Sequence, residues 1–182
     1  MTALEVSKYF LRKIDKESFE LYDNGISNLK MQKLLFFAQQ TFFSVYNKPL
    51  FKEDMEAWQL GPVVPKVYHH YKIYGRNNID IFQENLQIDN LDWNIMMILD
   101  FVYLKYAKYT AYALVDITHS LPCWINNINS HILNSHISIN DAINSLPPEV
   151  GAVVKYMMEL NEKERLEFMT CAISNCKKLN KD

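Results

Sequence analysis

Glycine is scarce in this sequence, at 4 of 182 residues. Folds rich in tight β-turns and loops that cradle phosphate both depend on glycine, because only glycine adopts left-handed backbone conformations without strain. The scarcity argues against a β-rich fold and excludes nucleotide-binding loops of the G-x-G-x-x-G and P-loop kinds. The glycines lie between the helical patterns of the sequence, at Gly25, Gly61, Gly75 and Gly151.

Cysteine and long apolar runs are also missing or rare. The three cysteines, Cys123, Cys171 and Cys176, are odd in number and form no C-x-x-C, so neither a disulfide framework nor a zinc knuckle is indicated. The amino-terminal segment is charged and amphipathic, unlike a signal peptide, and no stretch of 18 uncharged apolar residues follows it. The sequence therefore predicts a soluble cytoplasmic protein with no membrane partner.

An excess of positive charge is absent as well. Lysine and arginine total 19 against 21 aspartate and glutamate, a formal net charge of −2, and no segment is polybasic. Nucleic-acid binders usually carry a basic face that releases counterions from phosphate. We therefore predict no specific nucleic-acid partner.

Apolar residues make up 49% of the chain and recur mainly at helical spacing. Weak alternation over residues 54–60 allows at most a short β-strand or hairpin there, closed by a turn at Gly61 and Pro62. The predicted fold class is mainly α, as a single compact multi-helix domain over residues 1–182. The expected helices cover about residues 3–13, 27–46, 65–74, 91–106, 110–119, 138–146 and 161–178.

The segment 27–46 has the strongest helical pattern. Its phenylalanines widen the apolar face beyond one stripe, which predicts a central helix covered on more than one side. Lys30, Lys33 and Gln40 are predicted to form its polar edge. The Asn-rich segment 76–90 is predicted to be an exposed loop, attached to the body by Ile79, Ile81 and Phe82.

Catalytic and metal-binding patterns are weak. His131 and His136 are five residues apart, which does not match the spacing of a helical zinc pair. The most specific enzymatic hypothesis has Cys123 as a nucleophile and His119 as its base. However, no oxyanion-hole glycines surround them in the sequence. We predict no catalytic residues, no metal and no cofactor, with a Cys/His enzyme as the less favoured alternative.

Three segments together resemble one known family. They are NLKMQKLLFFAQQTFF at 28–43, EAWQLGPVVPKVYHHYKIYG at 56–75 and LVDITHSLPCWINN at 114–127. These motifs are similar to those of the Panacea domain, the SocA-like family of bacterial and phage proteins. The resemblance covers about residues 1–150 and leaves a closing carboxy-terminal helix at about 161–178. The chain departs from the family where Cys123 separates Pro122 from Trp124.

The resemblance implies a mostly helical fold without catalytic activity. Family members are antitoxins that neutralise toxins by direct protein contact, and one acts as an adaptor that delivers its toxin to a protease. The resemblance thus implies a protein partner, a toxin, and leaves open whether a protease also binds. A phage- or mobile-element-encoded inhibitor of another host or defence protein is the alternative, and homo-oligomerisation is undetermined.

The residues that carry the family motif have two interpretations. They hold the fold that presents a variable surface, which we favour, or they contact the partner directly. Trp58 and Tyr68 in particular are expected to be buried, with His119 and Trp124 packed beside them. The motif residues are Lys30, Gln32, Lys33, Trp58, Gly61, Pro62, Val67, Tyr68, His119 and Trp124.

Overall fold

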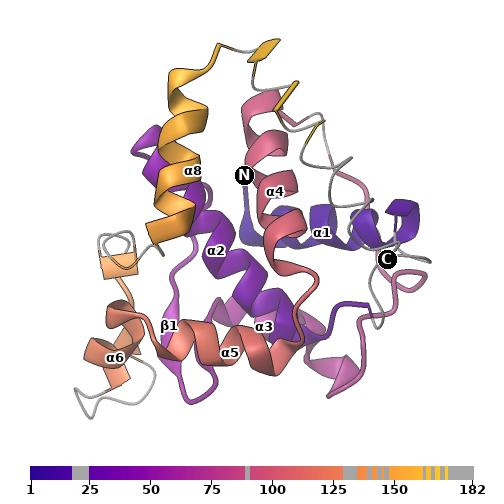
Figure 1. The fold of residues 1–182 in the computed structure, drawn as a ribbon. Helices are drawn as coiled ribbons and strands as arrows, with labels where there is room; N and C mark the ends of the chain where they lie inside the picture. Colours follow the sequence, from indigo (N-terminus) through magenta and orange to yellow (C-terminus); the bar gives the residue numbers. More distant parts are fainter. Residues whose placement is uncertain are drawn as a thin grey trace, which may run out of the picture.

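Helix α2 (Asn28–Tyr46) runs through the centre of the computed structural model (Figure 1). The structure describes residues 1–17, 25–88, 91–128, 135–138, 141–142, 145, 148–161, 163–164, 167–168 and 171. Around α2 lie α1 (Ala3–Glu17), α3 (Pro65–Tyr71), η1 (Lys72–Tyr74), α4 (Trp93–Tyr106), α5 (Ala111–His119), α6 (Pro122–Ile128) and α8 (Pro148–Glu159). The mainly α fold predicted from the sequence is confirmed.

Both ends of α2 are closed by local hydrogen bonds. The Lys30 N–H donates to the Ser27 hydroxyl at the amino terminus, as predicted for an N-cap. At the carboxyl terminus Asn47 adopts a left-handed conformation, with φ of 50°, and its N–H donates to the Phe43 carbonyl. The helix therefore spans almost the segment predicted for it.

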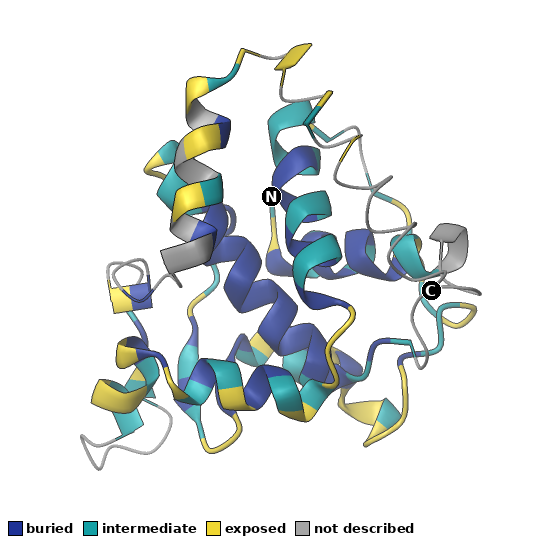
Figure 2. Ribbon diagram, in the orientation of Figure 1, coloured by how far each residue is buried: buried dark blue, intermediate teal, exposed yellow. Residues whose placement is uncertain are grey.

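Burial of α2 explains its central place. Nearly every residue from Asn28 to Phe42 is buried, and the helix is dark blue along most of its length in Figure 2. It packs against α1, α3, α4, α5, α8 and the strand β2. Phe37 stacks on Tyr106 of α4 with ring centroids 3.9 Å apart. Each fully buried large apolar side chain contributes about 1.5–3 kcal/mol, so α2 is the main source of core stability.

The predicted polar edge of α2 is wrong, because Lys30, Lys33 and Gln40 are all buried. Polar side chains of α2 instead bind the backbone of two segments outside the helix. Gln40 Nε2 donates to the Ala142 carbonyl. The Gln39 amide binds residues 50–51, accepting from both N–H groups and donating to the Phe51 carbonyl at 2.9 Å. Burial of a polar group is tolerated where it finds a hydrogen-bond partner, as both ends of the Gln39 amide do, whereas Gln40 Oε1 has none among the described residues.

A small antiparallel sheet stands beside α2. Its strands are β1 (Glu56–Trp58), β2 (Gly61–Val63) and β3 (Ser135–His136), in the order β2-β1-β3. Trp58 pairs with Gly61, so the hairpin turn is formed by Gln59 and Leu60. The predicted turn at Gly61 and Pro62 is therefore wrong, because both residues lie in β2. The hairpin itself lies where a short strand or hairpin was allowed.

Several predicted boundaries agree with the structure. Pro65 lies in the first turn of α3, and Gly75 ends η1 with φ of 58°. Thr110 caps α5 by accepting from the Ala113 N–H. In the predicted loop, Ile79 is buried and its N–H donates to the Ile26 carbonyl, whereas Phe82 is 90% exposed. Phe82 was therefore wrongly expected to attach the loop to the body.

The carboxy-terminal part contains an unpredicted element, α8. Pro148 was expected only to stop the preceding helix, yet it begins α8. The predicted reciprocal cap between Asn161 and Glu164 is present, but most of the predicted helix 161–178 lies outside the described residues. Among the helices that the structure describes, none is long and apolar enough to cross a membrane.

Candidate functional site

Lys33 lies at the centre of the candidate site. Its side chain is fully buried in α2, and Nζ donates to the Pro62 carbonyl at 3.0 Å. Burial lowers the pKa of Lys33 to about 7, because an amine removed from water is stabilised in its neutral form. A single long side chain thus fixes strand β2 to the central helix.

Gly61 makes this contact sterically possible. A Cβ added to Gly61 would lie 2.7 Å from Lys33 Nζ and 2.7 Å from Thr118 Oγ1. The residue also has φ of +93°, which side chains other than hydrogen rarely allow. Thr118 is fixed in turn, since its hydroxyl donates to the Val115 carbonyl at 2.9 Å. We call Lys33, Gly61, Pro62 and Thr118 the hairpin anchor.

A second buried chain of hydrogen bonds begins one residue earlier, at Gln32. Gln32 Oε1 accepts from the Val64 N–H at 3.0 Å, and its Nε2 donates to Asn28 Oδ1 at 2.9 Å. Asn28 Nδ2 then donates to the Tyr68 carbonyl at 3.0 Å. The start of α3 is therefore fixed to α2 by side chains, as β2 is by Lys33.

Aromatic side chains of the motif cover the hairpin. The ring of Trp58 meets that of Tyr68 edge to face, with centroids 4.8 Å apart. Trp124 Nε1 donates to the Trp58 carbonyl at 3.0 Å, and the Trp124 ring stacks on His119 at 3.8 Å. The predicted packing of His119 and Trp124 beside Trp58 is confirmed. All four residues are half-buried, so the expectation that Trp58 and Tyr68 are buried is only partly met.

The outer side of this aromatic group forms a groove of about 600 Å³, which we call the hairpin groove. It lies between the start of α2, the hairpin, η1 and the first residues of α5. Tyr112 and Leu60 in its wall are 67% and 43% exposed. The lining that bears on its chemistry consists of Gln32, Trp58, Leu60, Tyr68, Lys72, Arg76 and Tyr112.

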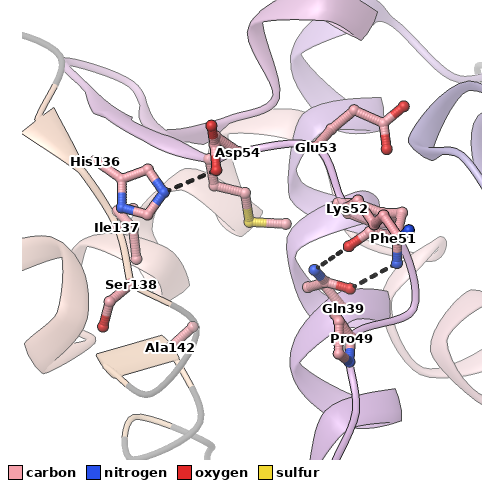
Figure 3. A pocket seen from close by; sticks show the side chains of 11 residues that line it. Gln39, Pro49, Phe51, Lys52, Glu53, Asp54, His136, Ile137, Ser138 and Ala142 are labelled. Atoms are coloured by element: carbon pink, nitrogen blue, oxygen red, sulfur yellow. Dashed lines mark hydrogen bonds and ion pairs between the residues drawn. The ribbon is translucent and has the colours of Figure 1, made fainter.

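A second pocket, of about 440 Å³, lies between the segment 49–55 and β3 (Figure 3). The Gln39 amide in its wall is engaged by Phe51, as the dashed lines show. Asp54 and His136 pair at 3.0 Å, but both side chains are more than half exposed. Since it contains none of the motif residues, we do not take this pocket as the functional site.

The Cys/His alternative finds no support in the geometry. Cys123 is buried, and burial raises the pKa of its thiol, which opposes formation of the nucleophilic thiolate. The His119 ring is stacked on Trp124, and burial followed by the nearby charge of Lys33 lowers its pKa. His131 lies outside the described residues. Among the described residues no group of three metal-binding side chains occurs.

The structure connects most of the predicted motif residues through the hairpin. Lys30 and Val67 are buried in α2 and α3 but have no contact with the hairpin anchor among the described interactions. Three residues of the site were missed from the sequence, namely Lys72, Arg76 and Tyr112, whereas Thr118 belongs to the recognised segment 114–127. Tyr112 lies on the same helix, α5, as the T-H motif formed by Thr118 and His119, which is the one signal that pointed to this helix as part of the site.

Comparison with known proteins identifies a family for this chain. Residues 31–125 match the model of the family described as "Antitoxin SocA-like, Panacea domain". The chain is also 45% identical over 53 residues to "Antitoxin SocA" of Caulobacter vibrioides (strain NA1000 / CB15N). That match covers 29% of this chain and 28% of the relative's length. No solved structure matches the chain significantly.

Proposed function

The chain belongs to the SocA-like Panacea family of antitoxins, and from this premise we propose that it neutralises a cognate toxin by binding it directly. The observation that carries this proposal is the hairpin groove, where large aromatic and aliphatic side chains remain partly in water beside two cations. Interfaces are enriched in tryptophan, tyrosine and arginine, which supply most of the binding energy. Residues of the family motif therefore line a surface whose composition is typical of protein–protein interfaces.

The rigidity of the groove supports the same proposal. Its hairpin wall is fixed to α2 by Lys33 and its α3 wall by Gln32 and Asn28. A surface held in shape before binding loses little conformational entropy when a partner docks. The groove therefore suits recognition of a folded partner rather than a catalytic step, since its described lining contains no histidine, cysteine or carboxylate.

Two modes of neutralisation are compatible with direct binding. The chain blocks the toxin by occupying its working surface, or it delivers the toxin to a protease as an adaptor. Both modes need the antitoxin–toxin contact, and we place that contact at the hairpin groove. They differ in the fate of the toxin, which persists in the first mode and disappears in the second.

The test begins with the product of the gene adjacent to this one. Its expression alone should arrest growth, and co-expression of this chain should restore growth. The two purified proteins should form a complex measurable by calorimetry. The half-life of the toxin, followed in cells with and without their ATP-dependent proteases, separates blocking from delivery. Absence of both rescue and complex would contradict the proposed function.

A further inference from the structure

The hairpin groove is lined by positive charge, whereas the chain as a whole is weakly acidic. The chain as a whole has a formal net charge of −2, yet the groove lining contains Lys72 and Arg76 and no carboxylate. Both cations are exposed and form no ion pair among the described residues. Resting on the proposed function, we infer that the groove accepts an acidic segment of the toxin that also carries an aromatic or aliphatic anchor.

Two carboxylates on neighbouring residues have hydrogen-bond partners other than Lys72 and Arg76. Glu84 pairs with His70 at 3.1 Å and accepts from the Tyr74 hydroxyl at 2.9 Å. Glu56 accepts from Trp58 Nε1 at 2.7 Å. A carboxylate supplied by a partner would therefore meet unpaired cations, and an arginine binds carboxylate through two parallel hydrogen bonds.

The apolar part of the lining determines the second property of the segment. Trp58 and Tyr68 meet edge to face, which leaves part of each ring toward the groove. Tyr112 and Leu60 also line the groove and are 67% and 43% exposed. A volume of about 600 Å³ lies within the range of sites that enclose a whole ligand, so one large side chain fits with its neighbours. A toxin segment with an aromatic or aliphatic side chain flanked by Asp or Glu would complement both the apolar and the cationic part of the lining.

Aromatic and cationic side chains together also occur in grooves for single-stranded nucleic acid. The overall charge of this chain opposes that occupant, since binding to a phosphate backbone depends on many cations acting together. Two lysine or arginine residues are enough for an acidic peptide but few for a polyanion. We therefore commit to the protein segment and treat nucleic acid as an outcome of the test.

The experiment compares two double variants of the full chain with equal changes of charge. Lys72→Glu/Arg76→Glu reverses the groove, and Arg12→Glu/Lys52→Glu reverses two exposed cations that do not line it. Melting temperatures confirm that both variants fold. Affinity for the purified product of the adjacent gene is then measured at about 50 mM and about 300 mM salt, where charge pairs are screened to different degrees. A photo-crosslinking amino acid in place of Tyr112 identifies the bound segment.

We expect the groove variant to lose at least about tenfold in affinity at low salt and the control variant to change by less than about threefold. The crosslinked toxin peptide should contain Asp or Glu beside an aromatic or aliphatic residue. Equal losses in both variants, an unchanged affinity of the groove variant or a basic crosslinked peptide would overturn the inference while leaving the antitoxin function standing.

Two further outcomes distinguish a failure of this inference from a failure of the proposed antitoxin function. If the wild-type chain neither binds nor neutralises the toxin, the proposed function fails and the inference falls with it. If a mixed-sequence oligonucleotide binds the wild type and binding is lost only in the groove variant, the groove is a nucleic-acid site and the inference is wrong.

Discussion

The two sides of the β1–β2 hairpin differ in how they use the same sequence motif. Toward α2 and α5, Lys33, Gly61 and Thr118 pack so closely that a single added methyl group has no space. Toward the groove, Trp58 and Tyr112 leave part of their rings in water. The comparison indicates that motif residues of one family need not share one role. We interpret the inner set as holding the hairpin and the outer set as available to the partner.

The largest expected effect is on the inner side, from Gly61→Ala. The new Cβ would contact Thr118 Oγ1 at 2.7 Å in a backbone with φ of +93°. Overpacking and backbone strain together should lower the free energy of unfolding by about 3 kcal/mol, or about 6–12 °C in melting temperature. Thermal unfolding followed by circular dichroism measures this change.

Gly75→Ala is the matched control for Gly61→Ala. Gly75 also has a positive φ, of +58°, but an added Cβ would meet nothing within 4 Å. Gly75→Ala should introduce the backbone strain of a positive φ without a close contact of the new Cβ. Its loss of stability should therefore be smaller than that of Gly61→Ala. Equal losses for the two glycines would show that the close approach of Lys33 and Thr118 contributes nothing.

The second effect concerns the buried amine of Lys33. Its pKa is about 7 in the folded chain and about 10.5 when unfolded, so between these values the unfolded chain binds more protons. Stability must therefore rise with pH across this window, by at most about 1.4 kcal/mol per pH unit from this group. In Lys33→Met the rise of the free energy of unfolding with pH that Lys33 contributes should be lost, most clearly between about pH 7 and about pH 9.

Denaturant unfolding at a series of pH values measures the slope, with Lys52→Met, an exposed lysine, as the control. Lys30, whose pKa burial also lowers, leaves a smaller slope of the same sign in the variant. Above about pH 9 the raised pKa of the Cys123 thiol acts in the opposite direction, so the comparison ends there. An identical slope in Lys33→Met would mean that Lys33 is not the buried amine we describe.

The third substitution is Trp58→Ala, at a residue that lies between the buried side and the groove side of the hairpin. Its ring is half-buried against Tyr68, and Nε1 donates to Glu56. Truncation of a core tryptophan costs about 3–5 kcal/mol, so Trp58→Ala should cost about half of that. It should also weaken toxin binding by about 2 kcal/mol. Measuring the melting temperature and the affinity on one purified variant gives both.

Trp58→Phe is the matched control, since it keeps a ring against Tyr68 but removes the Nε1 donor. It should retain most of the stability. A loss of stability in Trp58→Ala as large as that of a core residue, with affinity reduced only in proportion to unfolding, would restore the purely structural interpretation of this residue.

Local patterns in the sequence were enough to predict helices α1 to α5 and several of their ends, but not α6 and α8. Ser27 and Thr110 cap N–H groups within one turn, and Pro65 lies in the first turn of the helix that it begins, so the signal and its target are neighbours. The burial of Lys33 was not predictable in this way. Its partner, Pro62, lies 29 residues away, and the helical pattern alone marks a lysine as polar and solvent-facing. Gln40 was misjudged for the same reason, since Ala142 lies 102 residues away.

The candidate site was half predictable. The resemblance pointed to Lys33, Trp58, Gly61 and Tyr68, which the fold brings together from four elements. It did not indicate which of them face the groove, because that depends on the packing of α5 across the hairpin. Lys72, Arg76 and Tyr112 belong to the groove only through this packing and carry no pattern of their own. Exposed side chains of this kind leave no periodic trace in a sequence.

The smallest expected effect on stability, and the sharpest test of the comparison, is Tyr112→Ala. Tyr112 lies in the first turn of α5, is 67% exposed and has no hydrogen-bond partner among the described interactions. Alanine suits a helix at least as well as tyrosine, so the free energy of unfolding should change by less than about 0.5 kcal/mol. Affinity for the toxin should nevertheless fall by about 2 kcal/mol, a factor of about 30, if Tyr112 is one of the anchors of the groove.

Tyr109→Ala is the control for this last substitution, because Tyr109 is also exposed and adjacent to α5 but does not line the groove. It should leave the affinity unchanged. Calorimetric titration of both variants with the toxin decides the matter. If the two tyrosines behave alike, the outer side of the hairpin is ordinary surface, and the difference between the two sides lies in burial alone and not in function.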